Sequence, residues 1–265
     1  MSTLSFTLIQ TDLKWEDKKA NLTGFEEKIR PLKGKTQVVI LPEMFSTGFS
    51  MKPKELAENM NGESVNWMKR VAAENQVILT GSLIIQEGED YFNRLIWMLP
   101  NGQYGAYDKR HLFGYAGEDQ HYSSGTKRLI ASVNGWKINL QVCYDLRFPV
   151  WARQQSQEEG PEYDLLVYVA NWPERRRNAW MTLLQARAIE NQCYVIGVNR
   201  VGDDGNKIYH SGDSMLIDPM GDILYTKKDQ EAVYTASLDS ERLQHVRNSL
   251  PFLKDADGFV ILTGE

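Results

Sequence analysis

The sequence predicts a layered α/β fold with a mixed sheet, and three kinds of segment support that prediction. Continuous apolar runs such as residues 38–41 are typical of strands buried on both faces. Helical periodicity follows, for example in Leu22, Phe25 and Ile29, which share one face. Turn-forming residues such as the Pro-Asn-Gly segment at 100–102 join neighbouring strands as hairpins. Helical crossovers connect parallel strands and hairpins connect antiparallel ones, so a chain with both is expected to build a mixed sheet.

The first half of the chain is predicted to alternate strands with two helices. Asp12 is a candidate cap for the first helix and Ser64 for the second, because side-chain oxygens accept the unpaired N–H groups of a helix start. The strands are expected at residues 4–10, 38–41, 77–85 and 92–99. After them, residues 110–125 show no periodicity, and a long irregular segment inside a compact domain is often functional.

The second half continues this alternation. Strands are expected at residues 136–142, 164–170, 193–198, 214–218 and 233–238. Helices are expected at residues 149–157 and 178–192, the latter with Trp180, Leu184 and Ala188 on one face. A chain of 265 residues can hold two domains, but α/β folds of this size often form one. Residues 1–265 are therefore expected to form a single domain.

The composition argues against several classes of protein. The chain is 42% hydrophobic and 25% charged, with a net charge of −5 and a pI near 5.5, which gives no electrostatic basis for binding nucleic acid or an anionic membrane. No apolar stretch approaches the ~20 residues that span a bilayer, and the first residues do not resemble a signal peptide. The two cysteines, Cys143 and Cys193, make no disulfide framework. These features predict a cytoplasmic protein.

Three reactive side chains follow predicted strands. Cys143 comes directly after the strand at residues 136–142, and the loops at the carboxyl edge of an open sheet form a crevice for ligands. Glu43 follows the buried strand at 38–41, and Lys109 stands at the end of the strand that returns from the Pro-Asn-Gly turn. A lone cysteine is usually a small core residue. A carboxylate, an ammonium and a thiol at one sheet edge, however, have complementary roles in amide hydrolysis.

The motifs around these residues resemble those of the nitrilase, or carbon–nitrogen hydrolase, superfamily. LPEMFSTGF contains Glu43, YDKRHLF contains Lys109 and VCYDLRFPVW contains Cys143, in the order and at the spacings typical of that family. With ANWPERRR and LLQARAIENQ, they resemble its bacterial omega-amidase branch most closely. The resemblance covers essentially the whole chain and implies a four-layer αββα sandwich with mixed sheets. It also implies hydrolysis of omega-amides of 2-oxo dicarboxylic acids, such as 2-oxoglutaramate and 2-oxosuccinamate, to the 2-oxo diacid and ammonia.

The chemistry expected of these residues needs no metal and no organic cofactor. Lys109 would favour the Cys143 thiolate, and Glu43 can take the thiol proton as general base. After attack on a carboxamide, the Lys109 ammonium and the backbone N–H of Tyr144 are the expected donors to the oxyanion. A thioester remains when ammonia leaves, and a water deprotonated by Glu43 hydrolyses it.

Further site residues are expected from the resemblance and from position. The resemblance implies a second glutamate between the lysine and the cysteine, and Glu118 is the best match. The distal carboxylate of an omega-amide needs a cation or a backbone nest. Arg147 and residues 175–177 are candidates for that cation, although Arg147 can equally pair with Asp145. Trp172 can form a wall of the pocket or belong to the core.

The residues leave alternatives open. His111 and His121 are rival bases, as in cysteine–histidine pairs. A nitrilase or an N-carbamoyl amidase would use the same three residues on another small substrate. A protein of another class, a non-catalytic dimeric scaffold, would keep the fold, and a thiol redox sensor would need a second cysteine adjacent in sequence. Neither HExxH nor GxSxG occurs, which argues against a zinc peptidase and a serine hydrolase.

The tail at residues 239–265 carries more apolar surface than a free terminus, which is usually polar. Leu250 and Phe252 are followed by an apolar run at residues 259–262. The residues alone allow an edge strand packed on its own subunit. The resemblance implies that such tails are exchanged across a two-fold axis, so a homodimer with residues 250–262 at the subunit boundary is expected.

Overall fold

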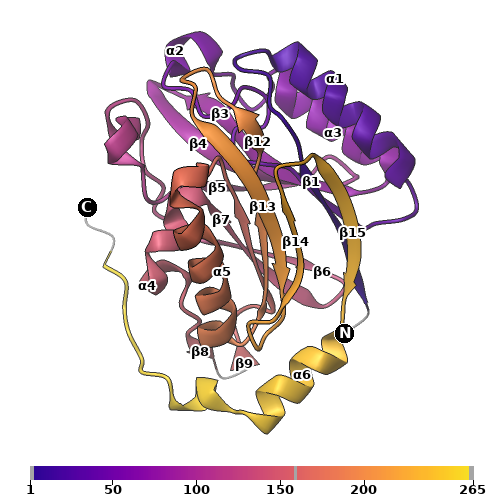
Figure 1. Ribbon diagram of the computed structural model, residues 1–265, viewed down its shortest axis with the longest axis vertical. Helices are drawn as coiled ribbons and strands as arrows, with labels where there is room; N and C mark the ends of the chain where they lie inside the picture. The colour runs from indigo at the N-terminus through magenta and orange to yellow at the C-terminus, as the bar shows by residue number, and fades with distance from the viewer. Residues whose placement is uncertain (1–2, 158–159, 263–265) are drawn as a thin grey trace.

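Two β-sheets stacked face to face form the centre of the computed structural model, which describes residues 3–157 and 160–262 (Figure 1). The first sheet has the strand order β15 (Ala232–Leu238), β1 (Leu4–Gln10), β2 (Val38–Ile40), β3 (Ile78–Glu87), β4 (Asp90–Met98) and β5 (Tyr104–Asp108). The second has the order β12 (Val201–Asp203), β13 (Tyr209–Ile217), β11 (Tyr194–Val198), β10 (Leu165–Val169), β7 (Trp136–Val142) and β6 (Leu129–Val133), and β14 (Ile223–Lys228) also pairs with β13. A short separate pair consists of β8 (Ser156–Gln157) and β9 (Gly160–Pro161).

Both sheets are mixed, as predicted. In the first sheet, β1, β2 and β3 are parallel neighbours, whereas β4, β5 and β15 are joined in antiparallel fashion. In the second sheet, β7, β10 and β11 are parallel, and β6 and β13 pair with them in the antiparallel sense. Parallel neighbours are connected through helices, because a parallel pair cannot be closed by a tight turn.

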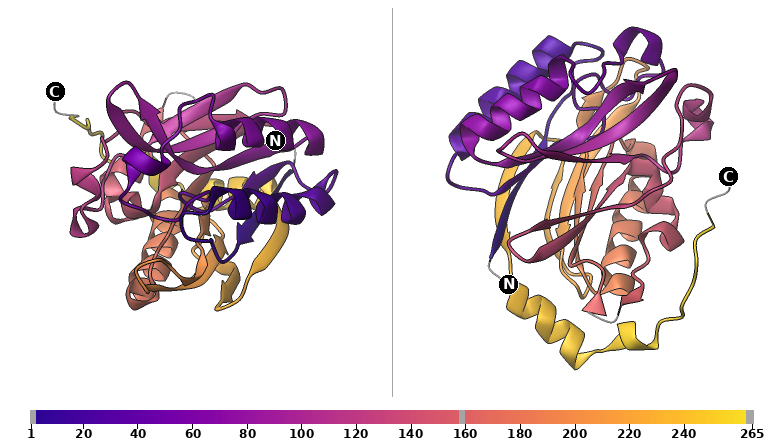
Figure 2. Two further views of the ribbon diagram at one scale, coloured as in Figure 1. Left: turned by 90° about the horizontal axis from the view of Figure 1, so that it is seen from above. Right: turned by 180° about the vertical axis from the view of Figure 1, so that it is seen from behind.

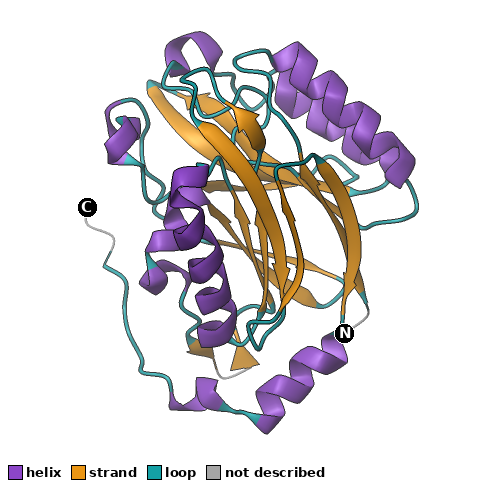
Figure 3. Cartoon of the chain, viewed as in Figure 1, coloured by secondary structure: helices purple, strands orange, loops and turns teal. Residues whose placement is uncertain are grey.

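Helices cover the two outer faces of the stacked sheets (Figures 1 and 2). α1 (Lys18–Ile29) and α3 (Glu63–Asn75) lie on the first sheet, and α5 (Arg177–Asn191) lies with the short α4 (Pro149–Ala152) on the second. α2 (Pro53–Leu56) and α6 (Ser240–Ser249) lie at opposite ends of the molecule (Figure 3). This arrangement is the expected four-layer αββα sandwich. Among the helices in the described ranges, none is long and apolar enough to cross a membrane.

The hydrophobic core is divided into layers because successive side chains of a strand point to opposite faces of its sheet. In β10, Leu165, Val167 and Val169 pack between the two sheets. Leu166 and Tyr168, which alternate with them, pack against the layer of α5. Both faces of this strand are therefore buried, which explains why its sequence is a continuous apolar run rather than an alternating one.

Some predicted helix boundaries were wrong, because other side chains supply the capping groups. Asp17, and not Asp12, caps α1, and its carboxylate accepts the N–H of Ala20 at 3.0 Å. Ser64 lies inside α3, where the carboxylate of Glu58 accepts its N–H at 3.0 Å. The helix expected at residues 149–157 ends at Ala152, because the next residue adopts an extended conformation.

The carboxyl-terminal part also differs from the prediction. The strands β12 and β14 and the helix α6 were not predicted, and the tail does not form an edge strand. Residues 256–262 belong to no sheet and run along the outside of the molecule (Figure 1). The side chains of Val260 and Leu262 are 81% and 86% exposed, whereas Ile261 packs partly against the core between the sheets.

The close packing of α5 on the second sheet predicts a stability change at Gly197. A Cβ atom at this position of β11 would lie 2.5 Å from Leu184 Cδ1 and 2.7 Å from Trp180 Cζ2. Gly197→Ala is therefore expected to lower the free energy of unfolding by about 1–3 kcal/mol, the usual cost of overpacking. Urea denaturation measures this change.

The matched control is Gly24→Ala in α1, where an added Cβ has no neighbour within 4 Å. Alanine is the better helix former by about 1 kcal/mol, so this variant is expected to be as stable as the parent or slightly more so. Equal midpoints for Gly197→Ala and the parent would contradict this close packing of α5 on β11.

Candidate active site

The ends of four strands, two from each sheet, bring the predicted reactive residues together. Glu43 follows β2 and Lys109 follows β5 in the first sheet. Cys143 follows β7 and Asn171 follows β10 in the second sheet. Because the two sheets are stacked, these ends face each other. The expectation that Glu43, Lys109 and Cys143 share one edge is thus met across two sheets rather than within one.

Lys109 is buried between two carboxylates. Its Nζ lies 2.9 Å from Glu43 Oε1 and 2.8 and 3.0 Å from the two oxygens of Glu118. All three residues are at most 1% exposed. An ammonium has three donors, and three carboxylate oxygens lie within hydrogen-bond distance of it. Glu118 lies in the irregular segment, at the start of the short helix η3 (Glu118–Gln120), and also accepts the N–H of Phe113 at 2.6 Å.

Cys143 occupies a strained turn at the edge of a cavity. It is the first residue of the 3-10 helix η4 (Cys143–Arg147), and its φ of +44° lies in the left-handed region. For a residue other than glycine this conformation costs about 1–3 kcal/mol and persists only where the surroundings hold it. A turn that departs sharply from a strand presents the side chain at its start to the space beyond the sheet.

The buried carboxylate of Asp145 stabilises this turn. It accepts the N–H of Val142 at 3.0 Å and the hydroxyl of Tyr107 at 2.7 Å. It also contacts the backbone N–H of His111 at 3.0 Å and its ring Nδ1 at 2.8 Å. Asp145 therefore connects the loop after Lys109 to the loop that contains Cys143. It does not pair with Arg147, so that alternative was wrong.

The charges of the site determine its resting protonation. Burial alone would lower the pKa of Lys109, but the negative charges of Glu118 and Glu43 outweigh it and raise that pKa well above its usual value. Burial raises the pKa of Glu118, and Glu43 adds to this effect against the attraction of Lys109. Burial, followed by the charge of Glu43, also raises the pKa of the Cys143 thiol. Lys109 opposes that shift, as expected, but the neutral thiol is the resting form.

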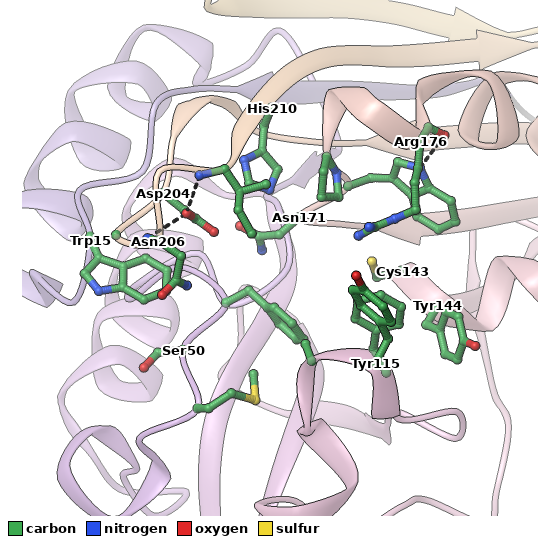
Figure 4. Close-up of a pocket in the computed structure, with 18 of the residues that line it drawn as sticks. Trp15, Ser50, Tyr115, Cys143, Tyr144, Asn171, Arg176, Asp204, Asn206 and His210 are labelled. Atoms are coloured by element: carbon green, nitrogen blue, oxygen red, sulfur yellow. Dashed lines mark hydrogen bonds between the residues drawn. The ribbon is translucent and has the colours of Figure 1, made fainter.

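A cavity of about 550 Å³ opens beside the thiol. Figure 4 shows Cys143, Tyr144, Tyr115 and Arg176 on one side of it and Trp15 on the other. Of the residues predicted for the site, Cys143, Lys109, Tyr144, Arg147 and Trp172 line this cavity, whereas Glu43 and Glu118 do not. Trp172 is both a wall and a core residue, because it is 3% exposed and also packs in the layer of α5.

Three arginines line the cavity without a carboxylate partner among the residues that the structure describes. They are Arg147, Arg175 and Arg176. The guanidinium of Arg147 lies 5.0 Å above the ring of Trp172. Burial and the charge of neighbouring Arg175 lower the pKa of Arg176, which is the direction expected where cations are crowded. Arg177 does not belong to the group, because it points to Asp213 at 2.8 Å.

The two rival histidines do not line the cavity. His111 stacks on Phe148 at 3.8 Å and contacts Asp145, and His121 is exposed. A different histidine, His210, lines the cavity, and burial lowers its pKa to about 4, so it is neutral at pH 7. In the described part of the chain, no cluster of three or more histidine, cysteine or acidic residues is arranged to hold a metal ion.

Two asparagines that contact Glu43 were not predicted. Asn171 donates its backbone N–H to Glu43 Oε2 at 2.8 Å and its side-chain amide to the Glu43 carbonyl at 2.6 Å. Asn93, inside β4, donates to Glu43 Oε1 at 2.8 Å. Each had a signal in the sequence, since Asn171 directly follows a buried strand and Asn93 interrupts an apolar one.

Comparisons with known proteins agree with this fold. The carbon–nitrogen hydrolase family model matches residues 6–248. The chain is 43% identical to the omega-amidase YafV of Yersinia enterocolitica, over 99% of this chain and all of that protein. It is 30% identical to the 2-oxoglutaramate amidase of Bacillus subtilis, over 95% and 96% of the two chains.

Solved structures extend the comparison. XC1258 of Xanthomonas campestris, a carbon–nitrogen hydrolase superfamily protein with an arsenic adduct in its active site, is 42% identical, with a TM-score of 0.96 over 98% of this chain and all of that one. Nit3 of Saccharomyces cerevisiae, a nitrilase superfamily member, is 25% identical, with a TM-score of 0.82 over 94% of each chain. Sequence and fold therefore agree along nearly the whole length, and the chain belongs to the carbon–nitrogen hydrolase family.

Proposed function

We propose that this protein is a cysteine-dependent amidase that hydrolyses omega-amides of 2-oxo dicarboxylic acids, such as 2-oxoglutaramate and 2-oxosuccinamate, to the 2-oxo diacid and ammonia. One observation carries the proposal. Cys143 and Lys109 line a cavity together with three arginines that have no carboxylate partner among the described residues, and the Glu43 carboxylate lies 2.9 Å from the Lys109 ammonium. The names of the relatives, omega-amidase and 2-oxoglutaramate amidase, support the same substrate class.

In the proposed mechanism, Cys143 Sγ attacks the amide carbon while Glu43 takes the thiol proton. This order suits a thiol that is neutral at rest, because the base removes the proton only as the bond forms. The tetrahedral oxyanion is stabilised by Lys109 and by the backbone N–H of Tyr144. The C–N bond then breaks, and Glu43 returns the proton to the leaving nitrogen, so ammonia departs and a thioester remains.

Water completes the cycle. Glu43 deprotonates a water molecule that attacks the thioester, the C–S bond breaks, and the proton returns to Cys143. Glu118 keeps the Lys109 ammonium in place through its two contacts at 2.8 and 3.0 Å. We assign no metal or organic cofactor to this reaction.

The arginines supply the specificity in this proposal. An omega-amide of a dicarboxylic acid carries a carboxylate at the end opposite to the reacting amide, and guanidinium groups bind carboxylates through paired hydrogen bonds. Arg147 is the main candidate, because it follows Cys143 within the same short helix and lies against Trp172. Trp172 holds the guanidinium flat in this role.

Alternative functions would require different features of the site. A nitrilase would cleave a neutral nitrile as fast as 2-oxoglutaramate, and the arginines would then have no function in binding. An N-carbamoyl amidase would cleave a carbamoyl amino acid as fast as 2-oxoglutaramate, and the arginines would then bind the carboxylate of that substrate. A non-catalytic dimeric scaffold would need no buried ammonium between two carboxylates. Burying charged groups is costly, so their arrangement around Lys109 favours an enzyme.

Three further assignments remain predictions. Two free thiols, Cys143 and Cys193, suit a reducing compartment, and we place the enzyme in the cytoplasm on that ground. We treat residues 1–265 as a single carbon–nitrogen hydrolase domain whose tail begins at residue 239. We propose a homodimer whose boundary includes residues 250–262, because exposed apolar side chains such as Val260 and Leu262 need a cover.

Arg147→Met tests the substrate class. Loss of a charge-assisted hydrogen bond costs about 1.5–3 kcal/mol, so kcat/KM for 2-oxoglutaramate is expected to fall by about 10- to 10²-fold. Hydrolysis of a short aliphatic amide without a carboxylate is expected to change little. Steady-state ammonia release from 2-oxoglutaramate, glutamine, an aliphatic amide and an aliphatic nitrile measures the preference.

Arg177→Met is the matched control, since Arg177 points to Asp213 and lies outside the cavity lining, and its substrate preference should equal that of the parent. Cys143→Ala provides the inactive blank. A parent enzyme that hydrolyses the aliphatic amide as well as 2-oxoglutaramate would refute the proposed substrate class.

Lys109→Met tests the role of the buried ammonium in stability. Removing one partner of a buried charged cluster costs about 3–5 kcal/mol, because two carboxylates are left facing each other. Glu118 already has a raised pKa, and loss of Lys109 raises it further. A carboxyl group whose pKa is higher in the folded state than in the unfolded state loses stabilising free energy as pH rises through its folded pKa.

The cost of Lys109→Met is therefore expected to be small near pH 5 and large near pH 8. Urea denaturation at both pH values measures it. Lys14→Met is the control, since Lys14 forms an exposed ion pair with Asp12 and should give a small cost at both pH values. An equal loss of unfolding free energy in Lys109→Met at both pH values would show that the buried carboxylates do not need the ammonium to stay ionised in the folded protein.

Val260→Asp tests the proposed dimer. The side chain is 81% exposed in the single subunit, so a charge there should leave the folded monomer intact. At a subunit boundary the same charge would be buried, and the dimer is expected to dissociate. Truncation after Ser249 is expected to give monomers or aggregates with weakened activity. Sedimentation velocity at micromolar concentration gives the result, and a full-length chain that sediments as a monomer would rule out the dimer.

A further inference from the structure

Asn93 contacts all three residues of the buried cluster, the two carboxylates through its side chain and Lys109 through the backbone. It lies in the middle of β4 and is fully buried. Its Nδ2 lies 2.8 Å from Glu43 Oε1 and 3.2 Å from Glu118 Oε1. Its backbone carbonyl accepts the N–H of Lys109 at 3.0 Å. A single strand residue therefore contacts both carboxylates with its side chain and fixes the lysine with its backbone.

We propose that Asn93 is a positioning residue that keeps Glu43 and Glu118 ionised and in place while Lys109 turns one of its N–H groups to the oxyanion. The inference rests on the proposed role of Glu43 as the general base. It assigns a function to an amide that touches no reacting atom and acts only through the two glutamates.

The donor count of Lys109 creates the need for such a residue. In the resting site, three carboxylate oxygens lie within 3.0 Å of the ammonium, which has three donors. An oxyanion that gains a hydrogen bond from Lys109 therefore competes with these contacts and weakens at least one of them. The carboxylate that loses the contact would then be buried next to a like charge. A second donor that stays in place removes part of that cost.

The amide of Asn93 suits this purpose because it is neutral. Two carboxylates that share a site oppose each other's ionisation, and hydrogen bonds to the charged forms favour ionisation. Each of the two N–H groups on Nδ2 can donate to a different glutamate. A second lysine at this position would supply the same donors, but it would also neutralise the negative charge that lets Glu43 accept a proton.

Few other groups face the cluster. Besides Lys109 itself, the titratable groups that face the two glutamates are Cys143 and Tyr122, and the hydroxyl of Tyr122 donates to the carbonyl of Ser50. The neutral donors are two backbone N–H groups. That of Phe113 donates to Glu118, and that of Asn171 donates to Glu43. In the described part of the chain, Asn93 is the one residue that donates hydrogen bonds to both glutamates through a neutral group.

The test replaces Asn93 with residues that donate differently. Asn93→Leu removes the donor, Asn93→Ser keeps a single shorter one, and Asn93→Asp keeps the shape but adds a third carboxylate. The acid limb of kcat/KM against pH reports the coupled titration of the glutamates in the free enzyme. A hydrogen bond to a charged group contributes about 1.5–3 kcal/mol, so the limb should move to higher pH by about one to two units in Asn93→Leu.

The shift of the acid limb is expected to increase in the order Asn93→Ser, Asn93→Leu, Asn93→Asp. In Asn93→Leu, kcat should fall by about 10- to 10²-fold while KM changes little. The control is Asn139, a buried asparagine of β7 that lies outside the cavity lining. Asn139→Leu and Asn139→Asp are expected to change the free energy of unfolding without moving the acid limb.

The outcomes separate this inference from the proposed function. If Glu43→Gln is inactive and the Asn93 variants lose activity equally at every pH, the positioning role is refuted and the base remains. If Glu43→Gln keeps wild-type activity, the assignment of the base itself fails. Far-ultraviolet circular dichroism across the pH range verifies that each variant is folded, and the serine and aspartate variants decide the question if Asn93→Leu does not fold.

Discussion

The buried contact of one ammonium with two carboxylates is the constraint on which the rest of the site depends. Lys109, Glu43 and Glu118 are almost completely removed from water, and buried charges are tolerated only when they are paired and hydrogen-bonded. Each carboxylate therefore needs further donors, which the backbone of Asn171 and Phe113 and the side chain of Asn93 supply. The segments that carry these donors come from both sheets, so forming the cluster requires the sheets to be stacked in register.

The nucleophile is held by a second network of a different kind. Cys143 has a left-handed backbone conformation that costs free energy, and the carboxylate of Asp145 offsets that cost by accepting hydrogen bonds from Val142 and His111. This network also ties the loop after β5 to the loop after β7. Lys109 and Cys143 are thus fixed relative to each other, although they belong to different sheets.

The charges around the cavity favour an anionic substrate, whereas the Cys143 thiol is neutral before the substrate binds. Burial keeps the thiol protonated, and this avoids a free thiolate that would react with other electrophiles. The arginines at the cavity wall supply positive charge in a protein whose net charge is −5. The overall charge therefore says little about the ligand, because a local group of cations determines what the cavity attracts.

The four-layer αββα arrangement was expected from the resemblance to a known family. The residues themselves predicted a layered α/β fold with a mixed sheet, the positions of most strands along the chain and the grouping of Glu43, Lys109 and Cys143. These features are local, since a buried strand followed by a reactive residue can be read from a few neighbouring positions. The helix caps at Asp17 and Glu58 are local but were missed, because Asp12 and Ser64 nearby carry side chains that can also cap a helix. The length of α4 was missed because the next residue is extended, and β12 and β14 were missed because they form by pairing with β13. Only the tertiary structure decided that Asn93 and Asn171 contact Glu43 and that Arg147 faces the cavity rather than Asp145. The physical reason is that these contacts join residues far apart in sequence, and such pairs are set by the stacking of two sheets rather than by any local pattern.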